Sequence, residues 1–226
     1  MEKNAKPKTY FVPPLLLFDS GLSKKENRLF EALLLVGGGW FAKQAALSAQ
    51  AALQIAQGLG LPRAEQRELF DAARMLDVGV PALCPQLFGA EQPQEDEEEQ
   101  AEIICIRLRN HPVLGARTAR DFGMGPLGVD GIASHHEYWN GSGYPQGLRE
   151  EGIPLGARIL SVASTWAALL LPAPPQRRQS EIEAEKSLEK LAGLVLDPSL
   201  VSLFLAARHH FWKEQPESPV AEKIGA

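Results

Sequence analysis

The chain has 226 residues with a formal net charge of −5, and 45% of its residues are hydrophobic. This size and composition are typical of a globular protein with one large domain or two small ones. An acidic chain argues against general nucleic-acid binding, although a local basic pocket could still take a small phosphorylated ligand. Because no run reaches the roughly 18–20 apolar residues of a membrane-spanning helix, and the chain has only two cysteines, we expect a cytoplasmic protein in a reducing compartment.

The first part of the chain predicts an N-terminal extension followed by two helices. Residues 1–39 form the extension, and its first part, 1–21, is interpreted as an extended segment packed on the domain rather than a signal peptide. It contains one helix, over 23–36, which begins with the capping-box pattern SKKE and ends at GGG. The next stretch, 40–57, is rich in the strong helix formers Ala, Leu and Gln. After GLGLP, a further helix is predicted over 63–77.

The central part of the chain predicts two more helices. An acidic block at 91–100, EQPQEDEEEQ, suits a solvated loop and the negative first turn of a helix that continues to His111. A loop and a second helix follow, and this helix ends near the paired histidines His135 and His136.

Three further signals mark the C-terminal helices. Pro154 stands at the start of a long buried helix, and SEIE at 180–183 is a second capping box. Asp197 and Pro198 provide an N-cap and a first residue for the last helix. No segment alternates with period two, so the fold class is predicted as all-α. The domain boundaries are set at 40–212, with a tail over 213–226.

One stretch carries a family resemblance. The residues HHEYWNGSGYPQGLREEGIPLGARILSVA, at 135–163, resemble the signature of the HD-GYP family, as do HPVLG at 111–115 and AARMLDVG at 72–79. Members of that family are all-helical, metal-dependent phosphodiesterases that hydrolyse the bacterial second messenger cyclic di-GMP. The resemblance covers roughly residues 40–210 and implies a single helical bundle of the HD superfamily in a bacterial signalling protein.

The chain departs from the family pattern at four positions that the resemblance would assign to catalysis. Gln44 and Leu76 stand where the family has metal-binding histidines, Ser164 where it has an aspartate, and Val80 where it has a lysine. Gln is a weak neutral donor and Leu cannot bind metal at all, so one of the family's metal ions is expected to be absent.

The remaining metal-binding set is Asp77, His111 and His135, with His136 as an additional candidate. One carboxylate with two or three imidazoles is a sensible single-metal site for Fe, Mn or Zn. The alternative is that these residues are hydrogen-bonded polar groups at a buried helix junction, with no metal bound.

The loop after the histidines is interpreted as an interaction surface or as a structural cover of the pocket. In the family this loop is associated with contacts to nucleotide or to GGDEF-type cyclases, and its aromatic residues suit an interface. Arg177 and Arg178 either contact a phosphate or belong to a solvated loop. Arg158 is expected to pair with Glu137 or with loop carbonyls. The loop residues are Trp139, Gly141, Gly143, Tyr144, Pro145 and Gly147.

The sequence therefore leaves three functions open. The preferred hypothesis is a catalytically impaired HD-GYP-like protein that acts as a binding or scaffolding component, with negligible cyclic di-GMP hydrolysis. The alternatives are a sensor that binds cyclic di-GMP or another nucleotide without cleaving it, and a phosphohydrolase with one metal ion.

Overall fold

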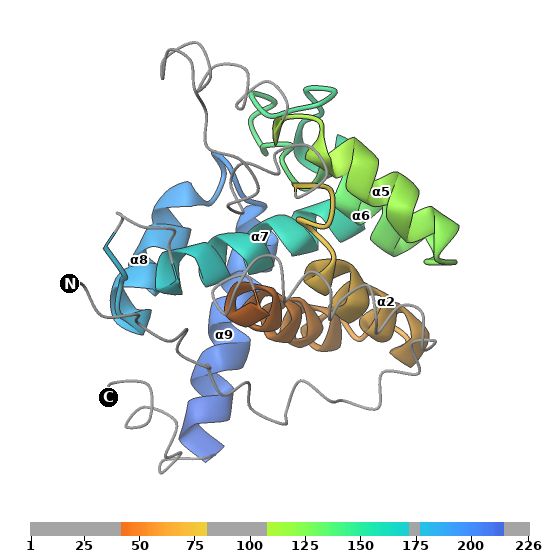
Figure 1. Ribbon diagram of the computed structural model, residues 1–226. Helices are drawn as coiled ribbons and strands as arrows, with labels where there is room; N and C mark the ends of the chain where they lie inside the picture. Colours follow the sequence, from red (N-terminus) through yellow and green to blue (C-terminus); the bar gives the residue numbers. More distant parts are fainter. Residues whose placement is uncertain (1–41, 81–107, 172–176, 215–226) are drawn as a thin grey trace, which may run out of the picture.

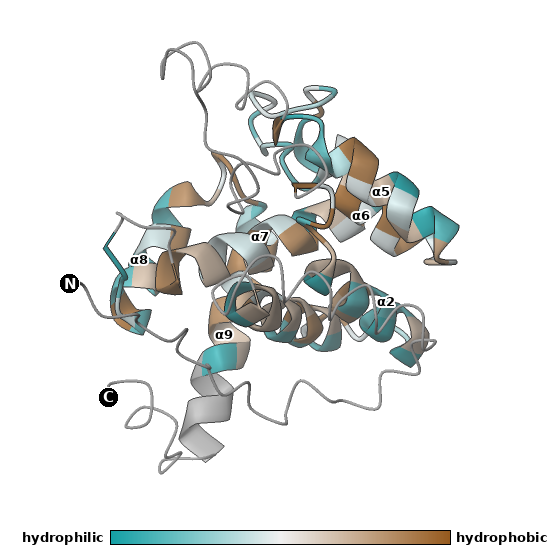
Figure 2. Cartoon of the chain, in the orientation of Figure 1, coloured by the Kyte–Doolittle hydropathy of each residue, from teal (hydrophilic) through white to brown (hydrophobic). Residues whose placement is uncertain are grey.

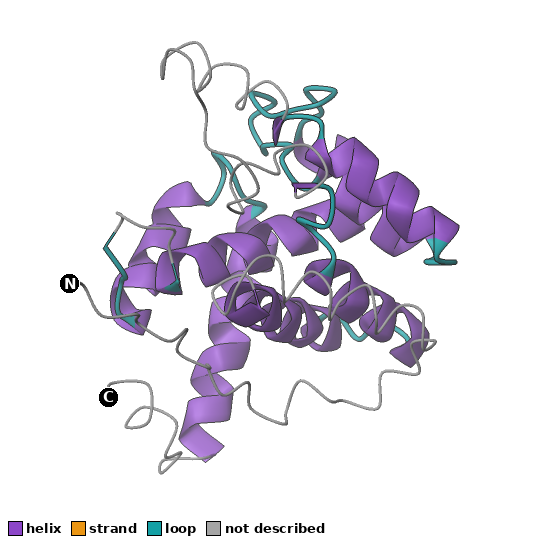
Figure 3. Cartoon of the chain, viewed as in Figure 1, coloured by secondary structure: helices purple, strands orange, loops and turns teal. Residues whose placement is uncertain are grey.

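The computed structural model describes residues 42–80, 108–171 and 177–214, and Figure 1 shows these as packed helices. Figure 3 shows no strand in the described ranges, where the β-type contact is a single bridge between Ala192 and Leu196. The all-α prediction is confirmed. None of the described helices is long and apolar enough to cross a membrane. The helices are 42–58, α2 (Arg63–Arg74), α5 (His111–Asp121), α6 (Pro126–Ser134), the short 3-10 helix η3 (Glu150–Gly152), α7 (Leu155–Leu170), α8 (Glu181–Leu191) and α9 (Pro198–Glu214).

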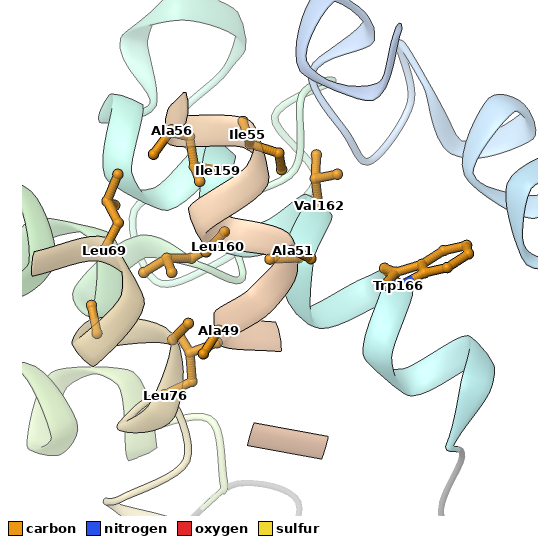
Figure 4. Close-up of a cluster of buried hydrophobic side chains, with 14 of the residues drawn as sticks. Ala49, Ala51, Ile55, Ala56, Leu69, Leu76, Ile159, Leu160, Val162 and Trp166 are labelled. Atoms are coloured by element: carbon orange, nitrogen blue, oxygen red, sulfur yellow. The ribbon is translucent and has the colours of Figure 1, made fainter. Parts of the chain in front are cut away.

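Helix α7 is the central element of the fold. It packs against α2, α6, α8 and α9 (Figure 1), and Figure 2 colours it mainly apolar to neutral, whereas α2 carries many hydrophilic residues. Figure 4 shows Ile159, Leu160 and Val162 of α7 close to Ile55 and Leu69. All five side chains are fully buried, so α7 shares one apolar core with the helix over 42–58 and with α2.

Helices α6 and α7 cross closely because glycines stand at the contact. A Cβ atom added at Gly156 would overlap the Leu127 carbonyl oxygen, and one added at Gly131 would lie 2.8 Å from Leu160. Helix α2 fixes the start of α6, since Glu68 Oε1 accepts a hydrogen bond of 2.6 Å from the Gly128 N–H. A carboxylate at a helix N-terminus satisfies a free donor and complements the helix dipole.

The predicted N-caps of the last two helices, α8 and α9, both form. The Glu183 N–H donates to Ser180 Oγ at 3.3 Å, and the Ser180 N–H donates to the Glu183 carboxylate at 2.8 Å, which completes the capping box of α8. Asp197 Oδ1 accepts from the Ser199 N–H at 2.8 Å. Pro198 is the first residue of α9, as predicted.

Arg208 joins α9 to α8 and α7. Its guanidinium lies 4.1 Å from the centre of the Trp166 ring. It also forms ion pairs with Glu181 at 2.8 Å and with Glu185 at 3.5 Å. The Arg208 side chain is only 11% exposed, so this one residue combines cation–π stacking, charge pairing and packing.

Two boundaries differ from the sequence predictions. The prediction that a helix continues to His111 is wrong at its end: residues 109–110 form a turn, and His111 is the first residue of α5 with Pro112 behind it. Proline suits the first turn of a helix, where its missing N–H costs nothing. Helix α2 begins at Arg63 as predicted but ends at Arg74, after which the chain turns through 75–79. The predictions for residues 1–39, for 91–100 and for the cysteines Cys84 and Cys105 lie outside the described residues.

Candidate metal centre

Three histidines meet where α5 and α6 pack together. His111 is the first residue of α5, and His135 and His136 directly follow the last residue of α6. One ring nitrogen from each lies within 4.8 Å of the others, with His111 and His135 buried and His136 half-buried. The packing of α5 on α6 therefore brings residues 24 positions apart into one cluster.

The orientation of two of these rings is fixed from behind by backbone carbonyls. His111 Nδ1 lies 2.6 Å from the Leu108 carbonyl oxygen, and His135 Nδ1 lies 2.8 Å from the Ile132 carbonyl oxygen. A carbonyl can only accept, so each Nδ1 carries a proton, and in the neutral form of the ring Nε2 is then left with a bare lone pair. A carbonyl behind a histidine ring is the usual arrangement around a metal-binding histidine.

The two bare nitrogens face each other at a distance that suits one metal ion. His111 Nε2 and His135 Nε2 are 3.3 Å apart. Two acceptors at this distance repel unless a positive centre lies between them. Two imidazole nitrogens about 2.1 Å from one tetrahedral zinc ion would be about 3.4 Å apart. The pair therefore fits a shared metal better than it fits a hydrogen bond.

Burial favours the metal-binding protonation state of His135 and His136. Burial, and then the neighbouring His111, lowers the pKa of His135 to about 3. Burial, followed by the charges of His135 and His111, likewise lowers the pKa of His136 to about 3. Both rings are neutral at pH 7, and the neutral imidazole is the form that binds metal.

Asp77 supplies a carboxylate at the edge of the cluster. Its Oδ1 is 3.5 Å from His111 Nε2, and its side chain is 42% exposed. The carboxylate thus marks the solvent side of the site, whereas His135 is at the buried side. The predicted ligand Asp77 lies outside the group of mutually close donor atoms, which consists of His111, His135 and His136. Three imidazoles are donors that zinc and iron accept, so these three residues fit a single ion.

The loop after the histidines folds back over them and is held by Glu137. This side chain is 1% exposed, and its two oxygens accept hydrogen bonds from the Gln146 N–H at 2.6 Å and the Leu148 N–H at 2.9 Å. The Tyr144 N–H donates to the His136 carbonyl at 3.0 Å. Gly143 is required in this return, because a Cβ there would overlap the His136 carbonyl oxygen.

Tyr144 covers one side of the histidine cluster. Its ring stacks on His136 with centroids 4.8 Å apart and planes 18° apart, and the Arg109 guanidinium lies 5.1 Å from the centre of the Tyr144 ring. Burial raises the pKa of Tyr144 to about 12, so the phenol is protonated at neutral pH. The sequence analysis missed Arg109, because its aromatic partner lies 35 positions away in the chain.

The other predicted loop residues serve the path of the backbone. The Trp139 N–H donates to the Val195 carbonyl at 3.0 Å, which ties the loop to the turn before α9. Gly141 and Gly147 have φ values of 81° and 69°, a region that glycine adopts without strain. Trp139 is half-buried, and Pro145 and Gly147 are exposed.

The four positions at which the sequence departs from the family resemblance have ordinary structural environments. Leu76 and Val80 are 4% and 7% exposed, and their aliphatic side chains offer no ligand atom. Ser164 Oγ donates to the Ser161 carbonyl within α7. Gln44 is half-buried on the helix over 42–58.

The predicted roles of three arginines have different outcomes. The expected pairing of Arg158 with Glu137 is wrong: Arg158 donates to the Ile153 carbonyl at 3.0 Å, as the loop-carbonyl alternative has it, and to Asp197 at 2.9 Å. The Glu137 carboxylate accepts from backbone N–H groups instead. Arg177 is 87% exposed beside Glu183, and Arg178 is also exposed.

Comparisons with known proteins agree on one family. A family model described as "HD domain" matches residues 28–200. The chain is 30% identical to the cyclic di-GMP phosphodiesterase of Thermotoga maritima over 67% of its own length and 40% of the relative's. It is 31% identical to the cyclic di-GMP phosphodiesterase response regulator RpfG of Xanthomonas campestris, over 80% of this chain and 47% of that protein. The chain thus spans less than half the length of either relative.

Solved structures show the same fold. A cyclic GMP-AMP-specific phosphodiesterase of V. cholerae superposes with a TM-score of 0.63 at 20% identity, over 90% of this chain and 53% of that one. The HD domain of the L. monocytogenes phosphodiesterase PgpH, in complex with cyclic di-AMP, superposes with a TM-score of 0.53 at 14% identity, over 79% and 93% of the two chains. Since the family model covers well over half of the sequence and these neighbours share the helical fold, the chain belongs to the HD domain family.

Proposed function

We propose that the chain is a metal-dependent phosphohydrolase that works with a single divalent ion of Fe, Mn or Zn. His111, His135 and His136 would hold the ion, with Asp77 beside it on the solvent side. The observation that carries the proposal is the pair of bare Nε2 atoms 3.3 Å apart, each fixed by a carbonyl behind its ring. A divalent ion in such a site supplies Lewis-acid stabilisation to a phosphoryl oxygen.

Asp77 and the loop that covers His136 determine the side from which a substrate would approach the metal site. Asp77 is the exposed member of the cluster, so a phosphate ester would approach from its side. The loop held by Glu137 covers His136 and limits access of water there. The names of the relatives suggest the substrate class, a cyclic dinucleotide phosphodiester.

A second candidate function is binding of a cyclic dinucleotide, or of a signalling protein such as a GGDEF-type cyclase, without hydrolysis. It is favoured by Leu76 and Val80, which are aliphatic and buried where the family resemblance implies a metal ligand and a lysine. Loss of one electrostatic donor typically lowers a catalytic rate by about 10²–10³. In this case the loop with Trp139 and Tyr144 would be the binding surface.

The two candidates are separated by assays on tag-free protein loaded with Zn²⁺, Mn²⁺ or Fe²⁺. We expect hydrolysis of cyclic di-GMP or of bis(p-nitrophenyl) phosphate that requires the metal and disappears in His135→Ala. Binding of cyclic di-GMP with no product would support the second candidate. Protein that takes up none of these metals would contradict the first.

A further inference from the structure

Arg109 is a cation near the histidine cluster. It lies in the turn before α5, two residues ahead of His111, and is exposed. Its guanidinium is 5.1 Å from the centre of the Tyr144 ring, and that ring is 4.8 Å from His136. These two distances place the guanidinium no farther than about 9.9 Å from the His136 ring.

The stacking on Tyr144 leaves Arg109 suited to bind an anion. The guanidinium carbon lies over the Tyr144 ring, and a guanidinium held beside an aromatic ring keeps N–H donors that can match two oxygens of a phosphate. The stack also limits the conformations of a long side chain, so less entropy is lost when an anion binds.

Neither arginine nor lysine belongs to the group formed by His111, His135 and His136. Of the other residues predicted for this site, Asp77 is an acid, and Val80 is aliphatic and buried. A phosphate near the histidines would thus meet the positive charge of Arg109 next to the metal-binding residues.

We propose that Arg109, which lies over the Tyr144 ring, is the phosphate-anchoring residue of this site. This inference rests on the proposed phosphate-ester function. The N–H groups of Arg109 donate hydrogen bonds to an oxygen of the reacting or of a non-reacting phosphate. Tyr144 positions the Arg109 guanidinium. The histidines bind the metal independently of Arg109.

The test measures phosphate affinity and metal content separately. Cyclic di-GMP and inorganic phosphate are titrated by calorimetry into apo and metal-loaded protein, for the wild type and for Arg109→Ala. Loss of a charge-assisted hydrogen bond should weaken binding about ten- to hundredfold, with metal content unchanged. Arg109→Lys should recover part of the affinity, and the salt dependence of binding should be smaller in Arg109→Ala than in the wild type. In apo protein, the Tyr144→Ala variant should lose phosphate affinity as Arg109→Ala does, whereas Tyr144→Phe should bind phosphate like the wild type.

The matched control is Arg120→Ala, which removes an exposed arginine near the C-terminal end of α5. This residue is about 13 Å along the helix axis from His111. Equal affinity of Arg109→Ala and the wild type, or no binding of either anion to wild-type protein in either form, would overturn the inference. In both of these outcomes the metal content of the protein would be normal. A failure of the proposed function would instead appear as missing metal or as metal without hydrolysis.

Discussion

Glu137→Gln should release the loop that covers the histidine cluster. The Glu137 carboxylate is 1% exposed and accepts two backbone hydrogen bonds, of 2.6 and 2.9 Å. A hydrogen bond to a charged group contributes about 1.5–3 kcal/mol. Glutamine keeps one acceptor oxygen, but its NH₂ group faces the second backbone N–H. We therefore expect a loss of about 2–3 kcal/mol in the free energy of unfolding.

The measurement is urea denaturation followed by far-ultraviolet circular dichroism, on apo and metal-loaded protein. The control is Glu151→Gln, an exposed carboxylate of the same loop region, which should change stability by less than about 0.5 kcal/mol. Because the loop places Tyr144 on His136, Glu137→Gln should also weaken metal binding. Stability of Glu137→Gln within the range of the control would show that the carboxylate does not hold the loop.

Three other predictions follow from packing and charge. Gly156→Ala should lower the free energy of unfolding by about 2–4 kcal/mol, because the added Cβ would overlap the backbone of α6. The control Gly152→Ala, whose added Cβ faces open space, should be near neutral. Equal melting temperatures of the two variants would contradict the close packing of α6 on α7. Arg208→Ala should cost about 2–3 kcal/mol through its lost stacking and ion pairs, with an unchanged urea midpoint as the contrary result. Burial lowers the pKa values of His135 and His136 to about 3 from 6.5. Apo-protein stability should therefore be full above pH 6.5 and fall below it by about 1.4 kcal/mol per pH unit for each of the two rings; a flat profile between pH 6.5 and 4 would contradict this.

Short sequence motifs predicted several helix ends correctly, because the hydrogen bonds that form these ends join residues close together in the chain. The capping box at Ser180 and the Asp197–Pro198 helix start depend on hydrogen bonds within three residues, and both form. The break before His111 was missed because a turn of two residues leaves little trace in a pattern of helix-forming residues. The resemblance to a known family, rather than periodicity, indicated that the histidines at 111 and 135 belong together.

Contacts between distant segments could not be predicted from the sequence. Glu68 caps a helix 60 residues away, and Arg158 pairs with Asp197 rather than Glu137 because the turn before α9 packs beside it. The stack of Arg109 on Tyr144 likewise depends on how the loop returns over the cluster. Each of these contacts is set by tertiary packing.

The proposal that three histidines hold one metal ion is tested most directly by metal content. Tag-free protein is loaded with Zn²⁺, dialysed and analysed by mass spectrometry for metal, together with X-ray absorption at the zinc edge. We predict about one ion per chain with mainly nitrogen ligands, and loss of that ion in His111→Ala and His135→Ala variants that remain folded. Sub-stoichiometric zinc in the wild type, or equal zinc in the wild type and both variants, would contradict the account.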